Sequence, residues 1–266
     1  MQRQSQTDAP GSSDSPRRRV RLGRIALDAL AFTDAIDAIS RLVDAGRGGT
    51  VFTPNVDHFV LAEQDDRFRT AYEHADLVLV DGTPVLWAAR LIGSPLPEKV
   101  SGSDLLLPLA ERAAQRGWRI YLLGGAPGVA QRVQAALERD FHGIRVVGTS
   151  CPVVDTGRPV SEQAAVLDAI RAAQPHVLFL ALGSPKQEVW AHQIRDVAGP
   201  MVIIGVGATF DFVAGAVRRA PRWISDLGFE WLYRLAREPR RLWKRYLLRD
   251  PRFALIVARQ LRHRRA

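Results

Sequence analysis

Residues 119–141 of the 266-residue chain, RIYLLGGAPGVAQRVQAALERDF, contain the pattern that decides the fold. The apolar run at 119–123 predicts a buried strand, the glycines after it predict a tight turn, and 128–141 has apolar residues at helical spacing. The same succession recurs downstream. It predicts strands at 145–148, 177–181 and 201–206, and helices at 161–173 and 186–196. Strands that alternate with helices pair in parallel through right-handed crossovers, so we predict an α/β, Rossmann-like fold with a mostly parallel sheet flanked by helices.

The first part of the chain follows the same rhythm. It predicts strands at 20–25, 50–53 and 77–80, and helices at 31–45, 56–74, 83–91 and 102–116. Residues 1–19 are polar and predict a disordered leader rather than a signal peptide, because they contain no apolar run. We therefore expect an α/β core at 20–217, followed by a basic helical appendage at 218–266.

The formal charge of +9 is concentrated in this appendage. Residues 218–266 contain 15 Lys or Arg against 4 Asp or Glu, whereas residues 1–217 contain 22 against 24. Trp223, Leu227, Trp231 and Leu235 recur at intervals of four, and the pattern breaks near Pro239 and again near Pro251. Such basic amphipathic helices are typical of proteins that bind an anionic membrane surface, so we expect a membrane and no nucleic acid as partner. Because clustered arginines also suit phosphate backbones, nucleic-acid binding stays open as the alternative.

The composition excludes several kinds of site. One cysteine, Cys151, permits neither an intramolecular disulfide nor a cysteine-rich zinc site, and the histidines show no metal-ligand spacing. The chain also lacks an Asp-x-Asp triplet, so we expect no metal and no cofactor. The longest apolar stretch, 201–217, is broken by glycines and is too short to span a bilayer. We expect a cytoplasmic protein.

The candidate functional residues lie in the loops after the predicted strands, where ligands of open parallel sheets bind. Asp81 follows the apolar run LVLV and is either a general base or the cap of the next helix. Gly124 and Gly125 form a turn that can bring backbone N–H groups to a phosphate, although they match no dinucleotide fingerprint. Gln187 opens a helix after Gly183-Ser184-Pro185, and either contacts a ligand or belongs to an ordinary helix start. Asp211 lies in an apolar run and needs a partner if it is buried.

Seven blocks, taken in order, resemble the WecG/TagA/CpsF family of bacterial glycosyltransferases, glycosyltransferase family 26. They are TPNVDHF, VDGTPVLWAARLIG, EKVSGSDLL, LLGGAPGVA, ALGSPKQE, GVGATFDFVAG and RAPRWISDLGFEWLYRLAREPRRLWKRYL. The resemblance runs from about Gly23 to Leu248 and so covers nearly the whole chain.

The resemblance implies an inverting, metal-independent transferase. It would move a sugar from a UDP-sugar donor to a polyprenyl diphosphate-linked saccharide acceptor during synthesis of surface polysaccharide or cell-wall polymer, on the inner face of the cell membrane. Two alternatives stay open, a non-catalytic protein that binds nucleotide sugars and an α/β protein whose tail binds nucleic acid. A homo-oligomer is also left open.

The resemblance also assigns roles to residues. Asp81 matches the general base, and Thr53, Asn55, Gln187 and Lys99 match catalytic or pocket residues. Gly124, Gly125 and Asp211 match blocks that face the nucleotide, and Arg234, Arg241 and Lys244 match tail residues that close over the diphosphate. Lys99 and Lys244 stand where the family usually has arginine, and lysine keeps the charge but loses the bidentate fork.

Overall fold

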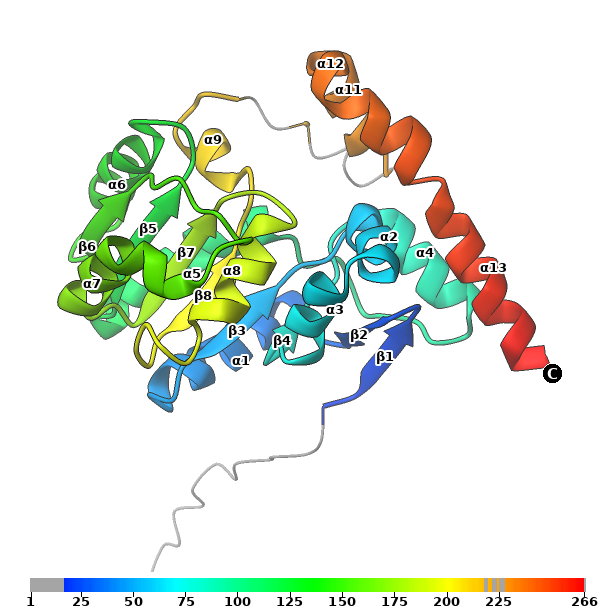
Figure 1. Ribbon diagram of the computed structural model, residues 1–266, viewed down its shortest axis with the longest axis horizontal. Helices are drawn as coiled ribbons and strands as arrows, with labels where there is room; N and C mark the ends of the chain where they lie inside the picture. The colour runs from blue at the N-terminus through cyan, green and yellow to red at the C-terminus, as the bar shows by residue number, and fades with distance from the viewer. Residues whose placement is uncertain (1–16, 218–219, 222–223, 225–227, 266) are drawn as a thin grey trace, which may run out of the picture.

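The computed structural model describes residues 17–217, 220, 221, 224 and 228–265. Within them, six strands form one sheet in the order β4-β3-β8-β7-β5-β6 (Figure 1), and all hydrogen-bonded neighbours run parallel. The strands are β3 (Gly49–Phe52), β4 (Leu77–Val78), β5 (Arg119–Gly124), β6 (Arg145–Ser150), β7 (Val177–Ala181) and β8 (Val202–Gly205). The predicted α/β fold with a parallel sheet is confirmed.

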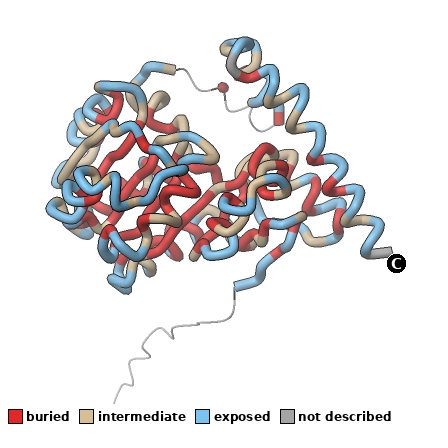
Figure 2. Tube along the Cα trace, viewed as in Figure 1, coloured by how far each residue is buried: buried red, intermediate tan, exposed pale blue. Residues whose placement is uncertain are grey.

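Helices cover both faces of this sheet. One face carries α1 (Phe32–Asp44), α5 (Gly102–Arg116), α6 (Val129–Asp140) and α9 (Thr209–Val213). The other face carries α2 (Val56–Gln64), α3 (Asp66–Glu73), α4 (Thr83–Leu91), α7 (Ala164–Ala173), which follows the short helix η1 (Val160–Gln163), and α8 (Lys186–Ile194). Strand residues alternate between the two cores: Leu178 and Leu180 point to the α2 side, and Phe179 points to the α5 side. Apart from the edge strand β6, whose residues are exposed or partly exposed, the strands are therefore largely buried on both faces (Figure 2), which explains their continuous apolar runs.

The adjacent strands β3 and β8 lead to helices on opposite faces. After β3 the chain enters α2, and after β8 it enters α9. Such a reversal opens a crevice at the carboxyl ends of the two strands, which is where open α/β sheets bind their ligands. The topology therefore predicts a ligand site at the loops after β3, β4 and β8.

The N-terminal segment differs from the prediction. The single strand expected at 20–25 is wrong, because the segment forms a hairpin of β1 (Arg19–Leu22) and β2 (Ile25–Asp28). Gly23 turns the chain with a φ of +54°, which an L side chain rarely adopts. Asp28 is buried, pairs with Arg19 at 2.9 Å and accepts the N–H of Val78 at 2.8 Å. The hairpin thus satisfies a backbone donor on the edge strand β4.

The helix expected at 56–74 is also wrong as a single element, because it is divided at Asp65. The side chain of Asp65 accepts the N–H groups of Arg67 and Phe68 at 2.9 and 3.1 Å, so it caps a second helix. Aspartate competes for backbone donors in this way, and the break turns α3 onto α8.

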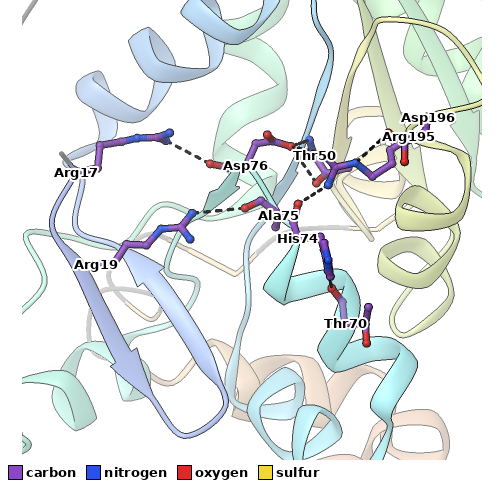
Figure 3. Close-up of polar contacts among 9 residues, drawn as sticks. All are labelled: Arg17, Arg19, Thr50, Thr70, His74, Ala75, Asp76, Arg195 and Asp196. Carbon is purple, nitrogen blue, oxygen red and sulfur yellow. Dashed lines mark hydrogen bonds and ion pairs between the residues drawn. The ribbon is translucent and has the colours of Figure 1, made fainter. Parts of the chain in front are cut away.

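At the amino-terminal ends of β3 and β4, Asp76 is the centre of a polar network (Figure 3). Its Oδ2 accepts the N–H of Thr50 at 2.8 Å and lies 3.5 Å from Arg195 Nη2. Its backbone carbonyl accepts a hydrogen bond from Arg17, and Arg195 also donates to the carbonyl of His74. The side chain of Asp76 therefore binds structural partners through Oδ2, a backbone donor of β3 and the cation of Arg195.

The C-terminal segment is helical, with α11 (Glu230–Arg237), α12 (Pro239–Trp243), η2 (Lys244–Arg249) and α13 (Arg252–Arg265). Its helices change at Pro239 and Pro251, as predicted. The predicted leader, up to residue 16, and the tail residues Trp223 and Leu227 lie outside the described residues. No helix in the described part of the chain combines the length and apolarity that crossing a membrane requires.

Helix α13 packs along α2 and the hairpin (Figure 1). The Phe253 and Phe59 rings lie 5.3 Å apart, and Gln260 accepts the N–H of Gly23 at 2.9 Å and donates to the carbonyl of Arg21 at 2.7 Å. Ile256 and Val257 are buried in the same core. The apolar face of α13 therefore packs against the core of the same protein. The predicted division into a core and an appendage at 217/218 stays a prediction.

Candidate functional site

A cavity of about 320 Å³ lies between the carboxyl ends of β3 and β4 and the C-terminal helices. The core contributes the start of α2, the loop that leads into α4, and Lys99; the tail contributes α11, η2 and the start of α13. The lining residues are Asn55, Val56, Asp81, Gly82, Thr83, Pro84, Lys99, Gly228, Glu230, Trp231, Arg234, Arg245, Tyr246, Asp250, Pro251, Phe253 and Ala254. Core and tail thus form one site together.

Asp81 is the carboxylate that the core places in this cavity. Its backbone N–H donates to the carbonyl of Pro54 at 3.0 Å, which holds the loop after β4 against the loop after β3. Ser101, at the start of α5, donates its hydroxyl to Asp81 Oδ1. Burial raises the pKa of Asp81, the hydrogen bond from Ser101 opposes this rise, Glu230 adds to it, and Lys99 opposes it. Asp81 is not the N-cap residue of α4, because Gly82 occupies that position.

The first turn of α2 also lines the cavity. Asn55 caps the helix through its side chain, which accepts the N–H of Asp57 at 3.2 Å, and the His58 ring accepts the N–H of Asn55 at 2.9 Å. Burial, together with the charges of Arg245 and Arg249, lowers the pKa of His58 to about 3. His58 is therefore neutral at neutral pH, with its proton on Nε2, because Nδ1 accepts the backbone hydrogen bond.

Two tail arginines contact this turn. Arg245 donates from Nη2 to Asn55 Oδ1 at 2.7 Å, and its Nε lies 3.3 Å from Asp57. Arg249 Nε lies 2.8 Å from the same carboxylate. The predicted pocket residue Asn55 is thus occupied by its helix cap and by the tail.

Gln187 and Glu188 do not line the cavity. The Gln187 amide donates to Glu188 at 2.7 Å and accepts the N–H of Gly207 at 3.1 Å, and both side chains are buried. Glu188 lies 3.8 Å from His58 Nε2, and burial raises the pKa of Glu188 to about 7. The structure places Gln187 as a link between α8 and the loop after β8, so any ligand contact by this residue remains a prediction.

Thr53 and Gly102 mark a close approach of the elements that surround the crevice. A Cβ added to Gly102 would lie 3.0 Å from Thr53 Oγ1 and 3.1 Å from the carbonyl oxygen of Gly205. A Cβ at this position would therefore press against Thr53 and the end of β8, so glycine suits the close start of α5. Thr53 lies at the switch point but not in the lining of the cavity.

The predicted nucleotide-binding residues also lie outside the cavity lining. Gly124 ends β5 and Gly125 follows it, both with positive φ. Gly125 donates its N–H to the carbonyl of Ala181 at 2.9 Å. Asp211 lies in α9 and is only partly buried, so it does not carry the cost of a fully buried carboxylate. Their roles toward a nucleotide remain predictions.

The predicted tail cations are placed differently from one another. Arg234 and Lys99 line the cavity, whereas Lys244 is exposed and lies 5.7 Å from the Trp243 ring. The side chain of Arg241 lies outside the described part of the structure.

Sequence reasoning missed Arg245, Tyr246, Glu230 and Ser101. Ser101 belongs to the conspicuous EKVSG block and could have been singled out, but nothing in the sequence distinguishes Arg245 from the other tail arginines.

No group of three or more His, Cys, Asp or Glu side chains suited to a metal ion occurs among the described residues. The chemistry that the cavity offers is a carboxylate of raised pKa beside several cations. That combination suits removal of a proton from one group and stabilisation of negative charge on another.

Comparison with known proteins identifies the family. The family model described as "Glycosyl transferase WecG/TagA/CpsF family" matches residues 20–266. The chain belongs to the WecG/TagA/CpsF family of glycosyltransferases. This match confirms the resemblance that the seven sequence blocks indicate.

Two curated relatives of this glycosyltransferase carry the name N-acetylglucosaminyldiphosphoundecaprenol N-acetyl-beta-D-mannosaminyltransferase. The protein from Bacillus spizizenii is 34% identical over 224 residues, which cover 84% of this chain and 83% of the relative. The protein from Bacillus subtilis is 31% identical over 234 residues, which cover 88% of each. The family match over residues 20–266 includes both the α/β core and the helical tail of this family member.

Proposed function

We propose that this family member is an inverting, metal-independent transferase that moves a sugar from a UDP-sugar to a polyprenyl diphosphate-linked saccharide. The acceptor class is supported by the names of the two relatives, which denote transfer to N-acetylglucosaminyldiphosphoundecaprenol. The observation that carries the proposal is the position of Asp81 in a cavity that core and tail line together.

In the proposed reaction, Asp81 takes the proton of an acceptor hydroxyl while that oxygen attacks the anomeric carbon of the donor sugar. The bond from that carbon to the diphosphate oxygen breaks on the opposite face, and UDP leaves with the electron pair. One such displacement inverts the anomeric configuration.

Three cations of the cavity, Lys99, Arg234 and Arg245, are suited to meet the charge that grows on the departing diphosphate. This arrangement supports a reaction that does not depend on a metal ion. Full activity in excess EDTA is the expected result, and loss of activity that Mg²⁺ restores would contradict it.

The tail surface supports an anionic membrane as the place of action, on the cytoplasmic face. Trp231 and Leu232 of α11, Trp243 of α12, and Leu247 and Leu248 of η2 are exposed among arginines. We expect co-sedimentation with vesicles that contain anionic lipid, and weaker binding to DNA at the same salt concentration. Stronger binding to DNA would favour the nucleic-acid alternative.

The decisive experiment is a screen of UDP-sugars, beginning with UDP-N-acetylmannosamine, against a lipid-linked N-acetylglucosamine acceptor. UDP release and product mass are both measured. Binding of UDP without any transfer product across the screen would point instead to a non-catalytic nucleotide-sugar-binding protein.

A further inference from the structure

Asp57 is a buried carboxylate that two tail arginines hold from one side. Its side chain is 5% exposed, and it lies 3.3 Å from Arg245 Nε and 2.8 Å from Arg249 Nε. Both arginines belong to η2, so the two ion pairs fix one segment of the tail at two points. Their spacing of four residues places both guanidinium groups on the same side of that segment.

The same contact builds the cavity. Arg245 bridges Asp57 and Asn55, and Arg245, its neighbour Tyr246 and Asn55 all line the cavity that contains Asp81. If the two ion pairs are lost, this part of η2 has no charged partner on α2. The part of the cavity lining that Arg245 and Tyr246 contribute then loses the interaction that orients it.

The ion pairs have the properties of a specific fastening rather than of a surface contact. Asp57 lies in the first turn of α2, where a negative charge is favourable, and it is shielded from water. Replacing Asp57 leaves both arginines without their carboxylate, and losing both arginines would leave a buried carboxylate without compensation, so the contact depends on both sides.

The other titratable groups near these two ion pairs cannot take the place of Asp57. Asp250, which follows η2, also lines the cavity, but it is a second carboxylate that interacts with the charges of the same two arginines. His58, on the same turn as Asp57, is neutral and directs its Nε2 toward Glu188.

We propose that Asp57 is a positioning residue that latches η2 onto α2 through Arg245 and Arg249 and so completes the cavity around Asp81. The latch itself stands on the contacts just described. Its consequence for sugar transfer rests on the proposed function.

Hydrogen exchange of the full-length protein, measured by mass spectrometry, tests the latch without any substrate. In the variant Asp57→Asn we expect amide exchange at 244–249 to accelerate at least about 10-fold, because the opening of η2 becomes more favourable. Exchange in β5 and β7 stays at the wild-type rate. Equal exchange at 244–249 in the variant and the wild type would overturn the latch.

Asp66→Asn is the matched control. Asp66 also lies in the first turn of a helix and pairs with an arginine, Arg69, at 2.9 Å, but it is exposed and outside the cavity. Asp66→Asn should leave amide exchange at 244–249 unchanged. Acceleration equal to that of Asp57→Asn would show a general effect of losing a carboxylate at a helix start, and it would also overturn the latch.

Arg249→Gln provides a second route in case Asp57→Asn does not fold. Since Arg249 is partly exposed and Arg245 still pairs with Asp57, we expect a smaller acceleration, of at least about threefold. Adding Arg249→Gln to Asp57→Asn should give no acceleration beyond that of Asp57→Asn alone. Additive effects of the two substitutions would mean that the residues act independently, contrary to the proposal.

Transfer assays then measure the consequence for catalysis. Asp57→Asn should reduce transfer at least about 10-fold, and Asp57→Glu, which keeps the charge, should restore part of it. If the wild type transfers sugar and Asp57→Asn is equally active, the positioning role fails. If the wild type transfers no sugar from any donor, the proposed function fails, and hydrogen exchange alone decides the latch.

Discussion

Asp76 and Asp81 lie on either side of the two-residue strand β4, and they are used in opposite ways. Asp76, at the amino-terminal end, accepts the backbone N–H of Thr50 and pairs with Arg195 (Figure 3). Asp81, at the carboxyl end, faces a cavity and accepts a hydrogen bond from Ser101. Burial raises the pKa of Asp81. The surroundings of the two carboxylates therefore separate a structural role from a candidate chemical role.

The difference between Asp76 and Asp81 shows at which end of the strands this fold leaves a carboxylate accessible to a ligand. At the amino-terminal ends of the strands, Asp76 joins β3, β4 and α8, so its side chain is engaged in structural contacts. At the carboxyl ends, the loops diverge toward opposite faces of the sheet and leave Asp81 room for a ligand. A carboxylate of perturbed pKa in a cavity is a typical feature of an active site.

The largest expected effect is that of Asp81→Asn on transfer. The amide cannot accept the proton of the acceptor, so the rate of transfer should fall by about 10²- to 10⁴-fold. Turnover close to that of the wild type would remove Asp81 from the role of base.

The stability of Asp81→Asn sharpens the comparison. Because the pKa of Asp81 is raised, the folded state holds this proton more tightly than the unfolded chain, and stability falls as pH rises through the raised pKa. Asparagine has no such cost, so the free energy of unfolding at neutral pH should equal or exceed that of the wild type. Urea unfolding followed by circular dichroism measures it, and a marked loss of stability would assign Asp81 a structural role as well.

Asp76→Ala should show the opposite pattern. It leaves the buried N–H of Thr50 without its acceptor and Arg195 without its partner, so we expect a loss of about 1–3 kcal/mol in the free energy of unfolding. Transfer per folded molecule should stay within about twofold of the wild type. If Asp76→Ala folds normally but transfers poorly, the separation between the two ends of β4 breaks down.

The smallest expected effects are shifts of the pH profile of transfer. The base must be ionised, so the acidic limb of kcat/KM follows the pKa of Asp81 in the free enzyme. Ser101→Ala removes a hydrogen bond that lowers this pKa, and the limb should move to higher pH. The decrease in kcat/KM should remain on the acidic side of the profile. An unshifted limb would mean that the profile does not report the pKa of Asp81.

Glu230→Gln should shift the same limb in the other direction. The charge of Glu230, on the tail helix α11, raises the pKa of Asp81, so its neutralisation should move the limb to lower pH. Lys99 and Asp104 also act on this pKa and are unchanged in both variants. Shifts of the same sign in Ser101→Ala and Glu230→Gln would contradict the electrostatic account of the site.

Local patterns were sufficient for most of the α/β core. The strand at 177–181 and the helices at 83–91 and 102–116 have the predicted bounds, because apolar runs, periodicity and glycine positions act over a few residues. The hairpin at the N-terminus and the break at Asp65 were missed. In both, one turn-forming residue overrides a weak periodic signal, Gly23 in the first and Asp65 in the second.

The sequence by itself determined the parallel α/β core, the family and the position of Asp81 at the end of a strand, because each depends on short segments or on their order. Only the tertiary structure decided which tail residues join Asp81. Arg245 reaches Asn55 across 190 positions of the chain, and the apolar face of α13 is buried on α2 instead of being exposed. The fifteen cations of residues 218–266 are chemically alike, so which of them enters the site depends on helix rotation and packing. Packing is a property of the folded chain as a whole.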